Sequence, residues 1–313
     1  MRIRPVSIVI AVLLTTAALP ALPQPTQYPL TVKDDAGNTV VLPAQPQRII
    51  SLTLFTDEML LSIVDRQRLI GVTTFAVDPQ VSNVAELAAG IPYKLTMNVE
   101  TIISLAPDLV LVANWSDPGS VKQLRDAGVP VYLMASGLTV RAIEEKIDKL
   151  AVMAGEPAKG RELIAGMDAR LAAVAGRVAR LSQDKKARVI DYAPWGSAQG
   201  RGSSWDEIIR RAGLIDGVVD LTSDEWGQVP LSKEMILQLD PDILILPGWV
   251  FGDPKGASAF YAQVVGDPAL QGLAAVKNRK VYPMPENLRS AVSQYIASSV
   301  EWLARTAYPE LFP

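Results

Sequence analysis

The chain has 313 residues, of which 49% are hydrophobic and 20% charged, and its formal net charge is −3. This composition is that of a globular protein with one large domain or two lobes, and it excludes a strongly basic nucleic-acid-binding surface. The sequence has no cysteine and no histidine. Disulfides, thiol nucleophiles, Ser-His-Asp triads and metal sites with Cys or His ligands are therefore excluded, and we predict neither catalytic nor metal-ligating residues.

Residues 1–24 are predicted to be a signal peptide that is cleaved. Arg2 and Arg4 precede an uncharged and mostly apolar stretch, residues 6–18, which is too short to span a bilayer comfortably. Small residues follow, and we expect cleavage between Ala18 and Gln24; an uncleaved membrane anchor is the alternative. Because the sequence offers no Cys for lipid attachment, we expect the mature protein to be unanchored in a Gram-negative periplasm.

The mature chain opens with a hairpin and an alternation of strands and helices. Residues 30–32 and 39–42 are apolar runs on either side of a Gly/Asn turn, which predicts the hairpin. Strands are predicted over residues 48–52 and 71–75, with a helix over residues 57–64 between them. Alternation of this kind is typical of βαβ units and a parallel sheet.

One sequence pattern occurs twice, in residues 99–115 and in residues 233–249. Each copy begins with a short amphipathic helix that a proline ends, and continues with an uninterrupted apolar strand of the kind found in sheets covered on both faces. At a constant offset of 134 residues the copies share Glu100 and Glu234, Ile102 and Ile236, Leu105 and Leu239, Pro107 and Pro241, Asp108 and Asp242, and Trp115 and Trp249. The repetition predicts two structurally similar halves.

A single helix is predicted between the halves, over residues 157–183. Six apolar residues recur there at spacings of three and four and define one helix face, namely Leu163, Met167, Leu171, Val174, Val178 and Leu181. About 25 residues at 1.5 Å each make a rod of roughly 37 Å that holds its ends at a nearly fixed separation. The predicted fold is therefore α/β, with two similar lobes, residues 25–156 and 184–313. Each lobe has a central parallel sheet, one long rigid helix joins the two, and a ligand cleft lies between them.

These motifs, in this order, resemble those of a known family. The matching segments are residues 34–37, 48–52, 71–73 and 98–110 in the first half, and residues 232–243 and 275–282 in the second. Over essentially the whole mature chain, the sequence resembles the periplasmic binding proteins for ferric siderophores, haem and cobalamin, whose two lobes are joined by one helical backbone. The resemblance implies a monomeric binding protein without a cofactor of its own. Such a protein is not an enzyme, and it delivers a small metal chelate to the permease subunits of an ABC importer in the inner membrane.

Glu100 and Glu234 occupy the same position in the two copies of the repeat. The resemblance implies that each lies on the outer surface of its lobe and pairs with an arginine of the permease, since family members carry a glutamate there. Two separated carboxylates would steer the encounter and fix its register on a two-fold partner. The alternative is that each glutamate only favours the positive end of its own helix.

Several aromatic residues follow predicted strands, and ligands of open α/β sheets bind beyond the carboxyl ends of strands. The rings placed at the cleft by this reasoning are those of Trp115, Tyr192, Trp195 and Trp249. The resemblance implies a cleft position for Phe75, Trp115 and Trp226, where family members carry cleft aromatics. Packing in the core is the alternative for each ring.

Three further residues complete the expected ligand site. Tyr93 stands seven residues before Glu100, as the axial Tyr does in haem-binding relatives, but the Arg that follows it there is missing here. Tyr93 is therefore expected either to contact a metal or to stack on the ligand. Arg201, in a Gly-rich loop, and Arg289 present planar forks suited to carboxylates or chelate oxygens, with a solvated surface position as the alternative for each.

The expected lining of the cleft indicates the class of ligand. A cleft with several aromatic rings and a few polar groups suits a large, partly planar molecule that contains a metal. We favour a ferric siderophore-type chelate, with cobalamin or another corrinoid close behind and haem as a further alternative. Two other classes stay open, namely a periplasmic carboxylate-based hydrolase, which needs two close Asp or Glu residues in the cleft, and a ligand sensor.

Overall fold

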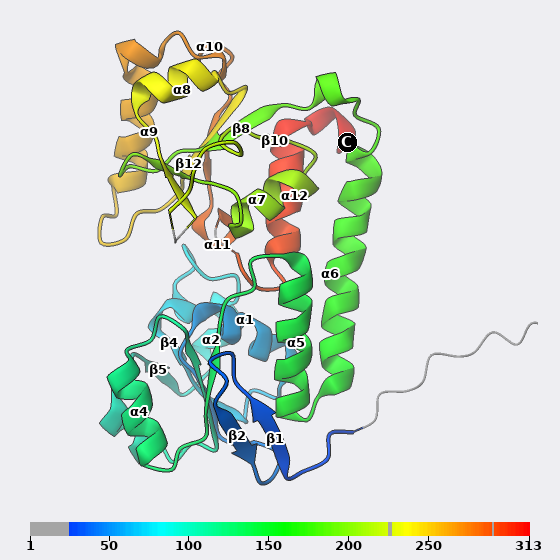
Figure 1. Cartoon of the computed structure of the whole chain (residues 1–313), viewed down its shortest axis with the longest axis vertical. Coiled ribbons are helices and arrows are strands. Elements are labelled where there is room, and N and C mark those ends of the chain that lie inside the picture. The colour runs from blue at the N-terminus through cyan, green and yellow to red at the C-terminus, as the bar shows by residue number, and fades with distance from the viewer. Residues whose placement is uncertain (1–24, 225–226, 290) are drawn as a thin grey trace, which may run out of the picture.

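The computed structural model describes residues 25–224, 227–289 and 291–313. It shows two α/β lobes, one above the other, with the long helix α6 (Pro157–Val178) running along one side of both (Figure 1). The signal peptide predicted for residues 1–24 lies outside the described residues. Within the described part of the chain, no helix is both long enough and apolar enough to cross a membrane.

The N-terminal lobe is built on a five-stranded parallel sheet with the strand order β5-β4-β3-β6-β7. Its strands are β3 (Ile49–Ser51), β4 (Leu69–Thr73), β5 (Tyr93–Leu95), β6 (Leu109–Ala113) and β7 (Val131–Met134). The antiparallel hairpin that precedes them consists of β1 (Leu30–Lys33) and β2 (Thr39–Leu42). The helices of this lobe are α1 (Leu54–Ile63), α2 (Ala85–Ala89), α3 (Val99–Ser104), α4 (Pro118–Asp126) and α5 (Val140–Ala154).

Strand β6 shows how an apolar run in the sequence determines which strand lies at the centre of the sheet. All five of its residues are buried, and they alternate between two apolar clusters, with Leu109 and Leu111 in one and Val110 and Val112 in the other. A strand can be apolar throughout only when both faces of its sheet are covered. The uninterrupted apolar run in the sequence thus encodes a central strand, and β6 pairs with β3 and β7.

The C-terminal lobe repeats this architecture with a four-stranded parallel sheet of order β10-β8-β12-β13. Its strands are β8 (Arg188–Asp191), β10 (Ile215–Asp216), β12 (Ile243–Pro247) and β13 (Val281–Met284), with an antiparallel pair, β9 (Ser197–Gln199) and β11 (Gln228–Pro230). Its helices are α7 (Ser204–Arg211), α8 (Lys233–Leu239), α9 (Gly256–Gly266), α10 (Ala274–Lys277), α11 (Glu286–Arg289) and α12 (Ile296–Ala307). Two similar lobes with parallel central sheets confirm the predicted fold class.

The linking helix α6 is shorter than its sequence pattern predicts. It ends at Val178, whereas the apolar spacing extended the prediction to residue 183. Leu181 still packs against the core from beyond the helix end, and a separate 3-10 turn follows at Gln183–Lys185. An apolar residue at the right spacing is therefore buried here without being helical.

Helix α6 does not join the lobes alone. Helices α5 and α12 pack against it along its length (Figure 1). One continuous apolar core contains Met59 of α1, Ile147 of α5, Met167 of α6, Trp205 of α7 and Val300 of α12. The lobes are therefore connected by a packed group of helices with a shared core rather than by a single rod.

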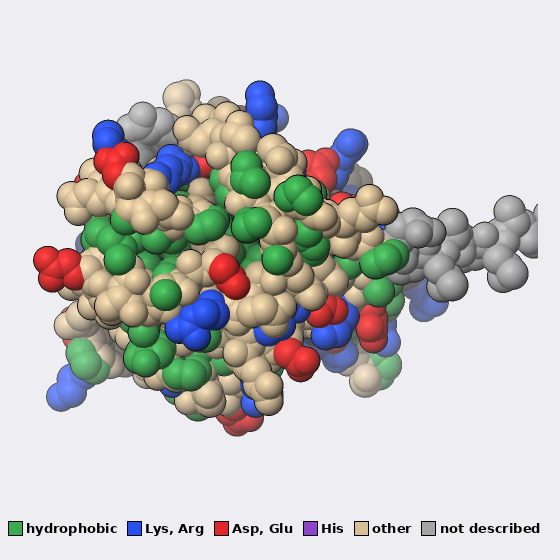
Figure 2. All heavy atoms as spheres, turned by 90° about the horizontal axis from the view of Figure 1, so that it is seen from below, with side chains coloured by type: hydrophobic (Ala, Val, Ile, Leu, Met, Phe, Trp, Pro, Cys, Tyr) green, Lys and Arg blue, Asp and Glu red, His purple; other side chains and the backbone are tan. Residues whose placement is uncertain are grey.

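The outer end of the N-terminal lobe carries a mixed surface. Figure 2 views the molecule from below and shows positive and negative side chains interspersed with hydrophobic ones on that face. Both signs of charge on one face agree with the small net charge of the chain.

Candidate functional site

A cavity of about 360 Å³ lies between the two lobes, and both lobes contribute to its walls. It opens at the carboxyl ends of equivalent strands, since Trp115 follows β6 and Trp249 follows β12, and both residues line it. Open α/β sheets bind their ligands at this edge, and pockets for small molecules measure roughly 300–1,000 Å³.

The described residues that line the cavity include the aromatic rings of Phe55, Phe75, Trp115, Trp249 and Phe251. Between ring centroids, Phe55 lies 6.0 Å from Trp115 in the N-terminal lobe, and Trp249 lies 5.9 Å from Phe251 in the C-terminal lobe. Phe75 meets Phe251 across the cleft at 6.2 Å. Trp115 is 59% and Phe251 73% exposed, so these two rings are not core residues, and their faces are available to a ligand.

A buried carboxylate, Glu58 of α1, also lines the cavity. Its Oε1 accepts the backbone N–H and the side-chain amide of Asn83, at 3.1 and 2.8 Å, and its Oε2 accepts the hydroxyl of Ser293 from the other lobe. Burial raises the pKa of Glu58 above its usual range, although these hydrogen bonds act to lower it. Glu58 therefore ties the two lobes together at the wall of the cleft.

Asn83 and Asn287 form a second link between the lobes beside Glu58. The Asn83 side-chain amide donates to the backbone carbonyl of Asn287 at 2.7 Å, and the Asn287 amide donates to Asn83 Oδ1 at 3.0 Å. The Gln294 amide donates to the backbone carbonyl of Glu58 at 2.8 Å. These bonds fix the separation of the lobes on one side of the cleft.

Asp57, next to Glu58 in α1, is fully buried. Its Oδ2 accepts the backbone N–H and the hydroxyl of Thr73, at 3.1 and 2.6 Å, which ties α1 to the carboxyl end of β4. Burial raises the pKa of Asp57 to about 8, against the opposing effect of its hydrogen bonds. At neutral pH this carboxyl group is therefore mostly protonated.

Glu100 and Glu234 lie in the first turns of α3 and α8, and both are exposed. Each helix is capped in the same way, because the side chains of Asn98 and Ser232 accept a backbone N–H of the first turn at 2.9 and 3.2 Å. The backbone N–H of Glu234 and the Ser232 hydroxyl hold the pKa of the Glu234 carboxyl below its usual range. Both carboxylates are accessible to a partner.

A family model described as periplasmic binding protein matches residues 49–288 of the chain. The chain belongs to this family. It is 24% identical over 289 residues to the uncharacterized ABC transporter substrate-binding lipoprotein YvrC of Bacillus subtilis, covering 91% of this chain and 87% of that protein. It is 27% identical over 252 residues to a cobalamin-binding protein of Halobacterium salinarum, covering 77% of this chain and 67% of that protein. The molybdate-bound structure of MolA from Haemophilus influenzae has the same fold, with a TM-score of 0.73 at 21% identity over 90% of this chain and 92% of its own.

The structure brings three of the predicted ligand-binding residues to the cleft of this periplasmic binding protein, namely Phe75, Trp115 and Trp249. Trp226 lies outside the described residues. The other predicted residues do not line the cavity, and they are Tyr93, Tyr192, Trp195, Arg201 and Arg289.

Arg289 and Tyr192 require correction, because they have structural partners instead of facing the cleft. The buried Arg289 guanidinium donates to both carboxylate oxygens of Asp191 at 2.9 Å and lies 3.6 Å from Glu286. Tyr192 is only 8% exposed, and its ring packs 5.4 Å from that of Phe260. The strand end suggested the cleft for Tyr192, and the planar fork suggested it for Arg289, but the direction of each side chain is set by partners far away in the sequence.

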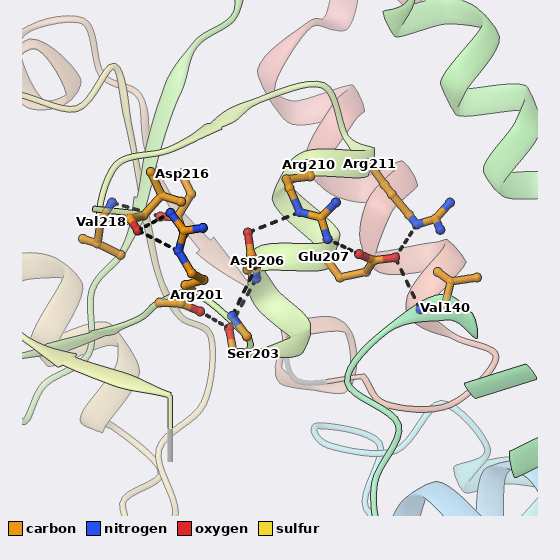
Figure 3. Close-up of polar contacts among 12 residues, drawn as sticks. Val140, Arg201, Ser203, Asp206, Glu207, Arg210, Arg211, Asp216 and Val218 are labelled. Carbon is orange, nitrogen blue, oxygen red and sulfur yellow. Dashed lines mark hydrogen bonds and ion pairs between the residues drawn. The ribbon is translucent and has the colours of Figure 1, made fainter. Parts of the chain in front are cut away.

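Arg201, Trp195 and Tyr93 lie outside the cavity as well. The Arg201 guanidinium donates to the backbone carbonyl of Val219 at 3.1 and 3.2 Å, and Figure 3 shows the side chain directed at the segment that follows β10. Trp195 is exposed on the surface. Tyr93 is the first residue of β5 and pairs with Gly71 in the middle of β4, so it lies away from the carboxyl edge of the sheet.

Glu207 of α7 links the binding protein's lobes at another point (Figure 3). Its Oε1 accepts the backbone N–H of Val140, the first residue of α5, at 3.4 Å, and the guanidinium of Arg211 at 2.7 Å. Burial acts to raise the pKa of Glu207, but the guanidinium groups of Arg211 and Arg210 hold it below its usual range. A negative charge is thus kept at the start of α5, where the helix dipole favours it.

Sequence reasoning missed several residues of the cleft, among them Phe55, Glu58, Phe251 and Asn287. Phe251 lies two residues beyond Trp249, and Phe55 follows β3, so the strand-end argument could have found both. Glu58 and Asn287 carried no such signal. The Ser293 hydroxyl that bonds to Glu58 is 235 residues away in the sequence.

A second cavity, of about 500 Å³, lies beside the linking helix. Its walls include Lys159, Arg170 and Tyr295, and the Arg170 guanidinium is already bonded to Ser298 and Glu301 at 2.9 Å. Within the described ranges, no cluster of three or more acidic side chains is arranged to hold a metal ion. The aromatic cleft between the lobes is therefore the candidate site of this periplasmic binding protein.

Proposed function

We propose that this protein captures a metal chelate of neutral or positive charge between its lobes and delivers it to the permease of an ABC importer. The observation that supports this most strongly is the pair of aromatic walls, one from each lobe, that meet at Phe75 and Phe251. Broad aromatic faces suit a large and partly planar ligand. Residues 1–24 would direct the chain to the periplasm and then be removed, leaving a monomeric, unanchored protein.

The polar groups of the cleft favour a ligand that is not an anion. Glu58, Glu286 and Asn287 line the cavity together with the rings. Carboxyl oxygens accept hydrogen bonds from amides and hydroxyls, aromatic faces attract a cationic centre, and no Lys or Arg is among the described lining residues. A corrinoid, with amides around its rim, fits these walls best, and the relative named a cobalamin-binding protein agrees with this choice. A ferric siderophore of low charge is second, which reverses the order expected from sequence.

The size of the cavity bears on how such a ligand would enter. At about 360 Å³ the cavity would enclose one edge of a corrinoid and leave the remainder in the mouth of the cleft. The contact between Phe75 and Phe251 lies across the path between the lobes. We propose that ligand entry separates these two rings, and that each ring then packs against the ligand.

Glu100 and Glu234 are the proposed contacts with the permease. Each is exposed in the first turn of a helix on its own lobe, so the protein would present two separated negative charges to its partner. Two such charges suit a partner composed of two like subunits, because each would meet an equivalent basic group.

A carboxylate-based hydrolase is less consistent with this site. Such an enzyme needs one carboxyl group free to transfer a proton and another free to attack or to activate water. Glu58 accepts three hydrogen bonds from Asn83 and Ser293, and Glu286 lies 3.6 Å from Arg289. Both carboxylates are engaged by structural partners, which suits binding better than catalysis.

A ligand sensor is the other alternative. A sensor would bind the same ligand without docking on a permease.

Ligand titration tests the proposed chelate class. We expect cyanocobalamin to quench the tryptophan fluorescence of the mature protein with a dissociation constant in the micromolar range or below, and ferrioxamine to bind more weakly. Molybdate and haemin should bind least, because no Lys or Arg lies among the described residues of the cavity wall to pair with their negative charge. Tight binding of haemin or molybdate alone would contradict the proposed ligand class. If none of the four compounds quenches the fluorescence and the protein turns over some substrate, the binding function itself is contradicted.

A further inference from the structure

Resting on the proposed docking role of Glu100 and Glu234, we propose that Ile103 and Leu237 form the apolar half of two docking patches. The partner would then present, at two places, a basic side chain beside an apolar hollow. Ile103 is 39% and Leu237 36% exposed, which places both among the exposed large hydrophobic residues of the described chain.

The two residues occupy equivalent places in the internal repeat. Ile103 lies three residues after Glu100 on α3, and Leu237 lies three residues after Glu234 on α8, so the offset of 134 residues holds for them too. Residues three apart on a helix are neighbours on one face. Each lobe therefore exposes one acidic and one branched aliphatic side chain side by side.

Both helices are anchored and ended in the same manner. The residues beside the exposed pair, Ile102 and Ile236, are completely buried, which fixes the rotation of each helix. Ala106 and Asp240 follow the helices with left-handed φ angles of 45° and 37°, each just before a proline. Residues other than glycine adopt this conformation only when the surrounding structure holds them in it.

An arginine holds the C-terminal end of each helix. Arg48 Nη2 donates to the backbone carbonyl of Leu105, just beyond α3, at 2.6 Å. Arg188 Nη1 donates to the backbone carbonyl of Leu239, the last residue of α8, at 3.4 Å. The backbone N–H groups of these arginines donate in turn to the carboxylates of Asp108 and Asp242, each at 2.8 Å. Each patch is therefore fixed to the first parallel strand of its own lobe, so docking would require little reordering of it.

Repetition distinguishes these residues from ordinary surface hydrophobes, which occur singly on most proteins. Two matched patches fit a partner with two like subunits, such as the dimeric membrane surface of an ABC permease. A second copy of this chain is a poorer partner, because its acidic patches would face acidic patches. The carboxylates would supply attraction that salt screens, and the aliphatic side chains would supply contact that salt does not screen.

The test measures docking on the permease–ATPase complex that imports the ligand, reconstituted in nanodiscs, at low and at high salt. We expect Ile103→Ser and Leu237→Ser each to weaken docking about three- to tenfold, by the same factor at both salt concentrations. The pair Glu100→Ala and Glu234→Ala should weaken docking mainly at low salt. Val41→Ser is the matched control, because Val41 is 51% exposed on β2, outside the repeat. Ligand affinity and melting temperature should stay unchanged in every variant.

The possible results separate this inference from the proposed function. If the glutamate variants dock weakly while Ile103→Ser and Leu237→Ser dock like the wild type, the apolar half of the patches is overturned and the docking role of the glutamates stands. A serine effect that disappears at high salt would overturn it too. If the wild-type protein does not dock at either salt concentration, both proposals are overturned.

Discussion

Trp115 and Phe251 are large rings that the fold leaves mostly uncovered, and they stand on opposite lobes of one cavity. Each has aromatic neighbours that set its orientation, Phe55 for the first, and Trp249 and Phe75 for the second. A ring held in place by its neighbours loses little freedom when a ligand covers its open face. These two residues should therefore contribute much of the binding energy.

Replacing either ring by alanine should weaken ligand binding with little effect on the fold. We expect Trp115→Ala and Phe251→Ala to cost about 2 kcal/mol each, or close to thirtyfold in the dissociation constant. Trp195→Ala is the control, because Trp195 is also exposed but lies outside the cavity. Isothermal titration calorimetry gives the affinities, and thermal unfolding checks the fold. A lowered melting temperature with unchanged ligand affinity would show that Trp115 and Phe251 stabilise the fold and do not bind the ligand.

Individual residues also show that the sequence predicts the position of a residue better than the direction of its side chain. Position after a strand correctly indicated the cavity for Trp115 and Trp249, since it places a residue at the carboxyl edge of a sheet. It does not give the direction of the side chain. Tyr192 directly follows β8, yet its ring turns to Phe260, and Arg289 turns to an aspartate 98 residues earlier. Contacts of that range leave no pattern in a single sequence.

At the scale of elements, the sequence was most informative where a pattern is local and repeated. The helix–proline–strand unit predicted both α3 with β6 and α8 with β12, because the amphipathic helix, the proline and the apolar run follow one another within 17 residues. It could not show that α5 and α12 pack beside α6, because packing between helices depends on the whole fold. The linking helix was therefore predicted as a lone rod.

The contact between α5 and α6 yields a prediction at this scale. Gly160 of α6 is buried, and a Cβ added there would overlap the Cβ of Ala151 on α5. Gly-to-Ala changes inside helices usually stabilise by up to about 1 kcal/mol, but we expect Gly160→Ala to destabilise by about 1–3 kcal/mol because it forces the helices apart.

Gly176→Ala on the same helix is the matched control for this change. A Cβ at Gly176 meets no atom within 4 Å, so its substitution should raise the free energy of unfolding. Urea unfolding of both variants measures the difference. Equal stabilisation by the two substitutions would mean that α5 and α6 are not in close contact at Gly160.

At the scale of the whole molecule, the lobes are joined at several separate places. Glu58 bonds to Ser293 at the cleft, Glu207 bonds to Val140 near α7, and a shared apolar core fills the space between the helices. Lobes fixed in this way cannot close over a ligand by a large hinge motion without breaking those contacts. Capture is therefore expected to involve local movement of rings such as Phe251 more than rotation of one lobe against the other.

The carboxyl groups buried near these links contribute to how stability depends on pH. Burial raises the pKa of Asp57 from 3.8 to about 8 and raises that of Glu58 as well. A carboxyl group whose pKa is higher in the folded state stabilises fully below its unfolded pKa, and that stabilisation is lost as the pH rises through the folded value. Glu207, with a lowered pKa, has the opposite effect, and its contribution is lost as the pH falls.

We therefore expect Asp57 to make the free energy of unfolding fall between about pH 4 and pH 8, by up to about 1.4 kcal/mol per pH unit. Asp57→Asn should flatten this slope, because the amide cannot ionise while its oxygen can still accept the two Thr73 hydrogen bonds. Asp65→Asn is the control, since Asp65 is exposed. Thermal unfolding from pH 5 to pH 9 measures the slopes, and an Asp57→Asn slope as steep as that of the wild type would show that Asp57 does not carry the effect. If stability no longer falls with pH in Asp57→Asn but still falls in Asp65→Asn, the single carboxyl group of Asp57 causes the decrease in this pH range.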